Sequence, residues 1–68
     1  METLRWLVTL LDNKVVAQEA CRSIVDLAYC RYLRNPNRDE FSKALKKVIR
    51  ISKDASTVER AKRYLEGV

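Results

Sequence analysis

The sequence predicts an all-α fold, a small single-domain bundle of four helices. Apolar residues make up 47% of the 68 positions, with a single Gly and a single Pro. This composition favours continuous helices joined by few turns over a sheet of short strands. Apolar residues also recur every three or four positions, which is helical spacing. Helices are expected at residues 3–11, 14–34, 38–52 and 56–66, within one domain covering residues 1–68.

The first expected helix, residues 3–11, is apolar on nearly every side. Thr3 is a candidate N-cap, and Asp12 and Asn13 are expected to end the helix. Six of the eight positions from Leu4 to Leu11 are apolar. Such a helix must be covered on more than one side. A β-strand is the alternative, because a short apolar run is ambiguous by period alone.

The second expected helix, residues 14–34, is predicted to be the spine of the bundle. Four residues of its apolar stripe are Ala or Cys, which let neighbouring helices approach closely. The stripe consists of Val16, Ala17, Ala20, Cys21, Ile24, Val25, Leu27, Ala28 and Tyr32. Asn35 and Pro36 are expected to break the chain after it.

The third expected helix, residues 38–52, is preceded by Asn37 as its candidate N-cap. The Glu40 side chain, three residues further on, is expected to reach back to Asn37 as in a capping box. Its apolar stripe consists of Phe41, Ala44, Leu45, Val48 and Ile51. The fourth helix, residues 56–66, is expected to begin at a capping box formed by Ser56 and Glu59 and to stop at Gly67.

Charge is distributed unevenly along the chain. The net charge is +5 and the isoelectric point is about 9.6. Residues 1–30 hold three cations and four acids, a net of −1, whereas residues 31–68 hold eleven cations and five acids, a net of +6. A basic half beside a nearly neutral half suggests a polyanionic partner on one side. The alternative is a helical protein with solvated, lysine-rich faces.

The strongest candidate for a polyanion surface is the back of the third helix. Its cations fall within ~120° of each other, and no acid interrupts the arc. They are Lys43, Lys46, Lys47, Arg50 and Lys53. Point cations of this kind neutralise phosphates without reading sequence. We therefore expect non-catalytic binding of nucleic acid, DNA rather than RNA; a solvated helix face is the alternative.

A second candidate surface combines aromatic rings with arginines. Tyr29 and Tyr32 interleave with Arg31, Arg34 and Arg38. Arginines grip phosphates, and aromatic rings stack on bases. The alternative is that the cations stabilise a helix C-terminus and the tyrosines border the core.

Residues 51–66, ISKDASTVERAKRYLE, resemble the turn and second helix of helix-turn-helix DNA-binding domains. The resemblance implies that the last helix enters the major groove of DNA. It also implies that Ser56, Thr57 and Arg60 face bases, with Arg63 further along the groove. The same residues are compatible with an ordinary capped helix.

A protein-interaction function is the alternative to nucleic-acid binding. The first helix carries more apolar surface than a small core is expected to bury, which suggests a homodimer or a place in a larger complex. The candidate interface residues are Leu4, Trp6, Leu7, Val8, Leu10 and Leu11. The chain would then act as an adaptor whose positive charge meets an acidic protein. Alternatively, the helix is buried within its own fold.

Several function classes find little support in the sequence. The chain has no His to act as a general base and no Gly-rich phosphate loop, so we expect neither enzyme chemistry nor a cofactor or metal. Cys21 and Cys30 would lie ~13.5 Å apart along one helix, too far for a disulfide. Reduced cysteines indicate a cytoplasmic protein. Apolar runs such as residues 6–8 are far too short to cross a membrane, and no signal peptide is recognised.

Overall fold

The computed structural model describes residues 2–66, and of Arg31 it describes only the backbone. These residues form five α-helices and one 3₁₀ turn. They are α1 (Glu2–Leu10), α2 (Ala17–Ala28), α3 (Arg31–Arg34), η1 (Asn35–Asn37), α4 (Arg38–Ile51) and α5 (Ala55–Glu66). Residues 2–66 contain no strand, so the strand alternative for the first segment is wrong.

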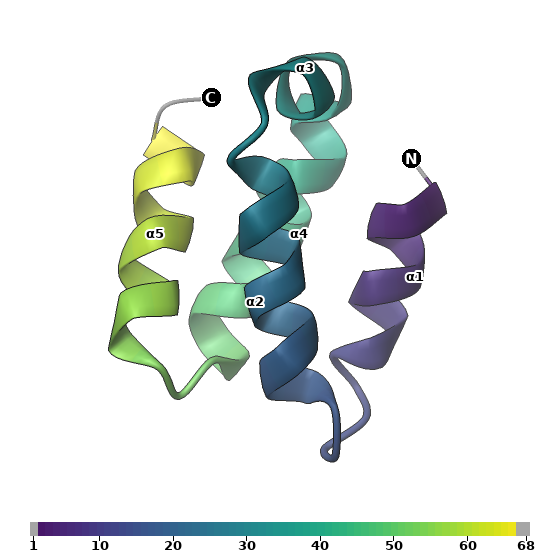
Figure 1. Cartoon of the computed structure of the whole chain (residues 1–68), viewed down its shortest axis with the longest axis vertical. Helices are drawn as coiled ribbons and strands as arrows, with labels where there is room; N and C mark the ends of the chain where they lie inside the picture. Colours follow the sequence, from purple (N-terminus) through teal and green to yellow (C-terminus); the bar gives the residue numbers. More distant parts are fainter. Residues whose placement is uncertain (1, 67–68) are drawn as a thin grey trace.

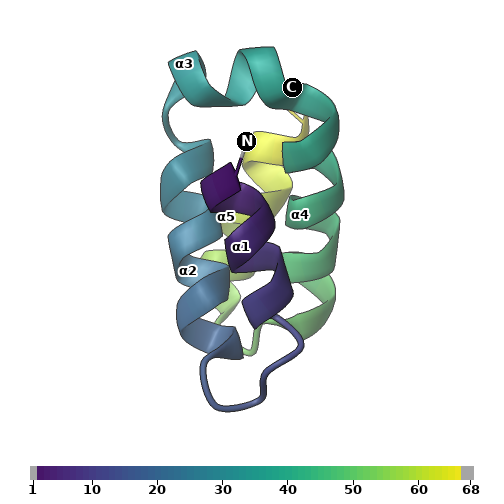
Figure 2. The same ribbon diagram turned by 90° about the vertical axis from the view of Figure 1, so that its right-hand side faces the viewer.

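The predicted all-α bundle is confirmed, and its four helices correspond to α1, α2, α4 and α5. These four run roughly along the long axis of the molecule, while α3 lies across one end (Figures 1 and 2). Both views show α4 and α5 side by side and antiparallel. The short connection between them, residues 52–54, requires that arrangement.

The core is built around α2, as the small residues of its stripe predicted. This helix contacts α1, α4 and α5, and the side chains of Cys21, Ile24 and Val25 are completely buried. The opposing helices contribute the other large core residues, which are Leu4, Phe41, Leu45 and Val48. Close approach at Ala17, Ala20 and Ala28 lets three helices pack on one.

Helix α2 begins at residue 17, three residues later than expected. The backbone N–H of Val15 donates to the side chain of Asn13 at 3.0 Å, and the N–H of Val16 donates to the Asn13 carbonyl at 3.1 Å. Asn13 thus holds the chain in a tight turn that competes with helix formation.

Helix α2 also ends earlier than predicted, at Ala28 rather than at residue 34. The Arg34 side chain folds back and donates from Nη1 to the Ala28 carbonyl at 2.7 Å. This hydrogen bond satisfies a backbone carbonyl at the C-terminal end of α2, where carbonyls have no partner within the helix. The chain turns at Tyr29 and restarts as α3. Tyr32, placed in the buried stripe by its spacing, is therefore 91% exposed.

Asn37 occupies the N-cap position of α4 as predicted, but the predicted capping hydrogen bonds are not formed. Asn37 makes no capping hydrogen bond; its Nδ2 donates to the Leu33 carbonyl at 2.9 Å. Glu40 does not turn back to Asn37 but accepts from Arg5 Nη2 at 2.6 Å. This ion pair joins α4 to α1. Pro36 sits within η1, so the chain continues from α3 into α4 without an extended break.

Helix α5 is capped by Asp54, two residues before the predicted Ser56. Asp54 accepts from the Ser56 N–H at 3.3 Å and from the Thr57 hydroxyl at 2.8 Å. Gln18 of α2 fixes the preceding turn by donating to the Ile51 carbonyl at 3.2 Å and accepting from the Lys53 N–H at 2.9 Å. The expected stop at Gly67 lies outside the described residues.

Candidate nucleic-acid interface

Helix α4 presents a basic surface on the side opposite its apolar stripe. Phe41, Ala44, Leu45 and Val48 are buried as predicted, and the helical period therefore directs the cations outward. We define the basic face as four exposed cations, namely Lys43, Lys46 and Arg50 of α4 and Lys53 in the connection that follows it. No ion pair joins their side chains to an acid within residues 2–66.

The fifth predicted member of the arc, Lys47, is used within the fold. Its Nζ donates to Asp12 Oδ1 at 3.0 Å, and only 27% of its side chain is exposed. Asp12 lies in the turn after α1, so this pair ties the α1–α2 turn to α4. Lys47 therefore borders the basic face with its charge already matched.

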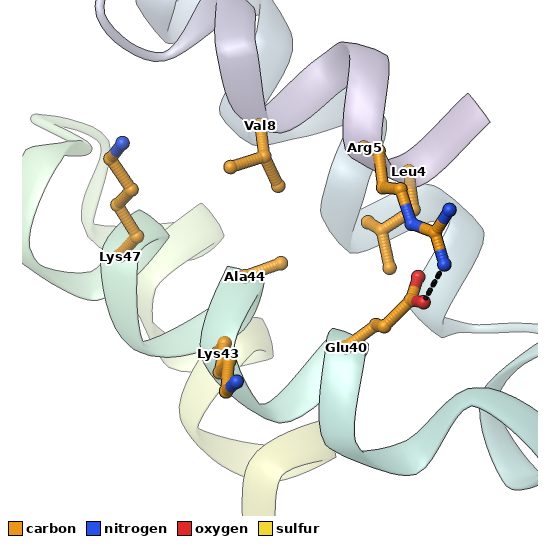
Figure 3. A pocket seen from close by; sticks show the side chains of 7 residues that line it. All are labelled: Leu4, Arg5, Val8, Glu40, Lys43, Ala44 and Lys47. Atoms are coloured by element: carbon orange, nitrogen blue, oxygen red, sulfur yellow. Dashed lines mark hydrogen bonds and ion pairs between the residues drawn. The ribbon is translucent and has the colours of Figure 1, made fainter. Parts of the chain in front are cut away.

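Two grooves border the basic face. Lys43, Lys46, Lys47, Ile49 and Arg50 line an open groove of about 510 Å³ along α4. A second groove of about 310 Å³ lies between α1 and α4, and Figure 3 shows its lining residues. Leu4, Val8 and Ala44 form its apolar floor, and the Arg5–Glu40 pair lies at one end. Lys43 and Lys47 line both grooves, so cations flank an apolar surface.

Arginine and tyrosine side chains gather where α2 and α5 approach α3. The Arg34 and Arg60 guanidinium carbons lie 5.5 and 5.7 Å from the centroid of the Tyr64 ring. The Tyr29 ring packs edge to face against Tyr64, with centroids 6.3 Å apart. We call these four residues the arginine–tyrosine cluster. Cation–π attraction and edge-to-face packing both stabilise this arrangement.

Arg60, which the helix-turn-helix resemblance places facing bases, makes its contacts within the fold. Its Nη1 lies 3.1 Å from Asp26 Oδ1, and its Nε and Nη2 donate to the Tyr64 hydroxyl at 3.4 Å. Arg34 is engaged in a similar way with the Ala28 carbonyl, and its Nε is buried with no acceptor among the described residues. Both arginines hold helices together.

The remaining cations and polar residues of the predicted interface differ in exposure. Arg38, Ser56 and Arg63 are exposed, whereas Thr57 is only 6% exposed and donates to Asp54. Of the residues that the helix-turn-helix resemblance assigns to bases, Thr57 is thus not accessible and Arg60 is paired. The side chain of Arg31 lies outside the described part of the chain.

The predicted protein interface on α1 divides into a buried and an exposed part. Leu4, Leu7 and Leu11 are buried in the chain's own core, so they provide no outer surface. Val8 and Leu10 are partly buried against that core. Trp6 is 61% exposed and borders a groove of about 440 Å³ between α1 and α2.

The sequence analysis did not identify Tyr64, whose ring contacts Arg34, Arg60 and Tyr29. The signal was the spacing of Arg60 and Tyr64, four residues apart on one helix, which brings their side chains together. The partners Tyr29, Arg34 and Asp26 lie on other elements. No local pattern connects them to Tyr64.

Both cysteines are free thiols, as predicted. Cys21 is completely buried, and burial raises the pKa of its thiol, whereas Cys30 is partly exposed in the turn after α2. Among residues 2–66, no three His, Cys, Asp or Glu side chains gather as a metal site would require. No helix in the described part of the chain is long and apolar enough to span a membrane.

Comparisons with protein-family models, with curated proteins and with solved structures gave no match to this chain.

Proposed function

We propose that this protein binds nucleic acid, without catalysis, through the basic face of α4. The observation that carries the proposal is the exposure of Lys43, Lys46, Arg50 and Lys53 with no acid paired to them among the described residues. The preferred ligand is DNA, and the contacts are made to phosphates.

The spacing of these cations suits a phosphate backbone. Lys43, Lys46 and Arg50 lie within α4, where a rise of 1.5 Å per residue gives a span of ~10.5 Å and places successive cations ~5 Å apart along the axis; Lys53 follows in the connection to α5. One strand of duplex DNA carries a phosphate about every 3.4 Å. The two charge densities are comparable, so several cations can neutralise phosphates at once and release the counterions bound there.

Repulsion within the basic face argues against a purely structural role. Within α4, Lys43 and Lys46 are three positions apart, and Lys46 and Arg50 are four positions apart. Like charges at this spacing destabilise a helix by about 0.2–0.5 kcal/mol per pair, or roughly 0.4–1 kcal/mol for the two pairs. The helix dipole offsets this cost only near the C-terminus of α4, not at Lys43 and Lys46. A polyanion would offset it along the whole face.

The test compares Lys46→Ala with Lys62→Ala, two exposed lysines within helices. Lys62 has Glu59 and Glu66 three and four residues away, so it is a suitable control: an exposed helical lysine with acidic neighbours. We expect Lys46→Ala to weaken binding of all sequences alike. The slope of log K against log salt should fall by ~0.9 on duplex DNA and ~0.7 on single strands, measured by fluorescence anisotropy.

Equal effects of the two substitutions would contradict the proposal, because they would show only the loss of overall positive charge. Wild-type protein that binds neither DNA nor RNA at low salt would contradict it directly. In that case the positive charge would be better explained by an acidic protein partner.

A further inference from the structure

We infer that Tyr29 and Tyr32 form a stacking surface for unpaired nucleobases, so that the protein prefers single-stranded to duplex nucleic acid. The inference deepens the proposed function and rests on it for the phosphate contacts. It adds a second surface, at the α2–α3 corner, on which the flat faces of bases stack.

The first observation is the exposure of the two rings. Tyr32 is 91% exposed and Tyr29 is 72% exposed, although aromatic side chains usually bury most of their area. Tyr29 lies in the turn that follows α2, and Tyr32 lies three residues later within α3. A single exposed aromatic residue is common, but two mostly exposed rings within four consecutive residues offer aromatic surface to a ligand.

The second observation is that Tyr29 is held in place. Its edge-to-face contact with Tyr64 is supported by the guanidinium groups of Arg34 and Arg60, which lie over the Tyr64 ring. Arg60 is in turn anchored to Asp26. Since the ring is already ordered, a base that stacks on its exposed side loses less conformational entropy than one that stacks on a mobile side chain.

The third observation is exposed positive charge on α4, which follows α3 and η1, and on α5, which carries Tyr64. Arg38 at the start of α4 and Arg63, next to Tyr64 in the sequence, are exposed, and no ion pair joins either to an acid within residues 2–66. Cations beside exposed aromatic rings are the combination that binds single strands, because phosphates meet the charges while bases stack on the rings. Both DNA and RNA have this chemistry.

The stacking of bases within a duplex explains why the two rings should distinguish single from double strands. In a duplex the faces of each base are covered by its neighbours in the stack, so a surface ring gains no stacking partner unless a base is extruded. In a single strand the faces are available, and stacking depends little on sequence. The rings should therefore add affinity for single strands alone.

The experiment measures binding of oligothymidine, oligouridine and a duplex of equal length by fluorescence anisotropy. Tyr32→Ala should weaken binding of single strands about tenfold, within the range of roughly 5- to 150-fold that loss of one stacked base represents. Tyr32→Phe should retain wild-type affinity, because the ring remains. Duplex binding should be unchanged in both variants. Comparing thymidine with uridine oligomers shows whether DNA or RNA is preferred.

Trp6→Ala is the matched control, because Trp6 is an exposed aromatic residue on α1, away from this corner. It should leave binding of single strands unchanged. Photocrosslinking of a bound oligomer, followed by mass spectrometry, should locate the attached base on Tyr29 or Tyr32. Circular dichroism will confirm that the variants are folded, as expected for substitutions of exposed side chains.

Two results separate this inference from the proposed function. Suppose Lys46→Ala weakens binding, while Tyr29→Ala and Tyr32→Ala do not. The stacking surface is then wrong and phosphate binding by α4 stands. If the wild-type protein binds none of the three ligands, both proposals fail together.

Discussion

Replacing Thr57 with Val tests whether Asp54, rather than Ser56, begins α5. The Thr57 side chain is buried, and its hydroxyl donates to Asp54 Oδ2 at 2.8 Å. Val has nearly the same shape but no hydroxyl, so the substitution removes the hydrogen bond and leaves the packing unchanged. A hydrogen bond of this kind contributes about 1 kcal/mol to folding. For a domain of this size, that loss lowers Tm by roughly 4–8 °C.

Ser56→Ala is the control. The Ser56 side chain is exposed, and only its backbone N–H takes part in the cap, so its loss should change Tm by no more than a typical surface substitution. Thermal unfolding followed by circular dichroism at pH 7 measures both variants. If Ser56→Ala is the more destabilising of the two, the assignment of Asp54 as the cap is refuted.

The same hydrogen bond gives the cap a pH dependence. The Thr57 hydroxyl, followed by the Ser56 backbone N–H, lowers the pKa of Asp54 below its ordinary value. A carboxylate with a lowered pKa in the folded state stabilises the fold above its unfolded pKa of about 4, and this contribution is lost as the pH falls through the folded pKa. The difference between wild type and Thr57→Val should therefore be largest at neutral pH. A difference that is unchanged at pH 2 would contradict this reasoning.

The cysteines and Trp6 give two further predictions. Without reductant, an alkylating agent should modify the partly exposed Cys30 in the native protein but the buried Cys21 only after unfolding; mass spectrometry showing equal rates would contradict the packing of α2. Trp6→Ala should lower stability by much less than the about 3–5 kcal/mol expected for a buried Trp, because its ring is largely exposed. Sedimentation of the same variant tests the protein-interaction alternative: a dimeric wild type and a monomeric variant would support it, and a monomeric wild type would remove it for this surface.

Periodicity was sufficient to predict the four long helices and the buried side of α4. Phe41, Ala44, Leu45 and Val48 were expected on one stripe and are all buried. The spine role of α2 also followed from local sequence, because small residues at helical spacing have few uses other than close packing. These predictions succeeded because a helix fixes which residues share a side, whatever the partner helix is.

The end of α2 could not be predicted in the same way. No Gly or Pro lies near Tyr29, while Pro36, the strongest breaker in the chain, sits inside a 3₁₀ turn that continues into α4. The helix stops because Arg34 returns to the Ala28 carbonyl and stacks on Tyr64 of α5. A ring on the last helix thus takes part in ending the second, and a local pattern contains no such information.

The eleven cations of residues 31–68 show the same contrast on the surface, between what local spacing predicts and what contacts between distant residues determine. Helical geometry placed Lys47 with its neighbours on one arc, but it does not reveal that Lys47 pairs with Asp12, 35 residues earlier. Nor does it reveal that Arg60 pairs with Asp26 on α2. The fold therefore divides a charge run that looks uniform into cations that are matched and cations that are not.

The two proposed surfaces also differ in their main kind of cation. The unmatched basic face of α4 is mostly lysine, a compact and strongly hydrated charge that suits phosphates of variable position. The cations at the tyrosine rings are arginines, whose planar guanidinium groups stack on aromatic faces. Lysine substitutions on α4 should therefore change the salt dependence of binding, and ring substitutions at the α2–α3 corner should change the preference for single strands. Because the two surfaces act through different physical contacts, each can be removed while the other is retained.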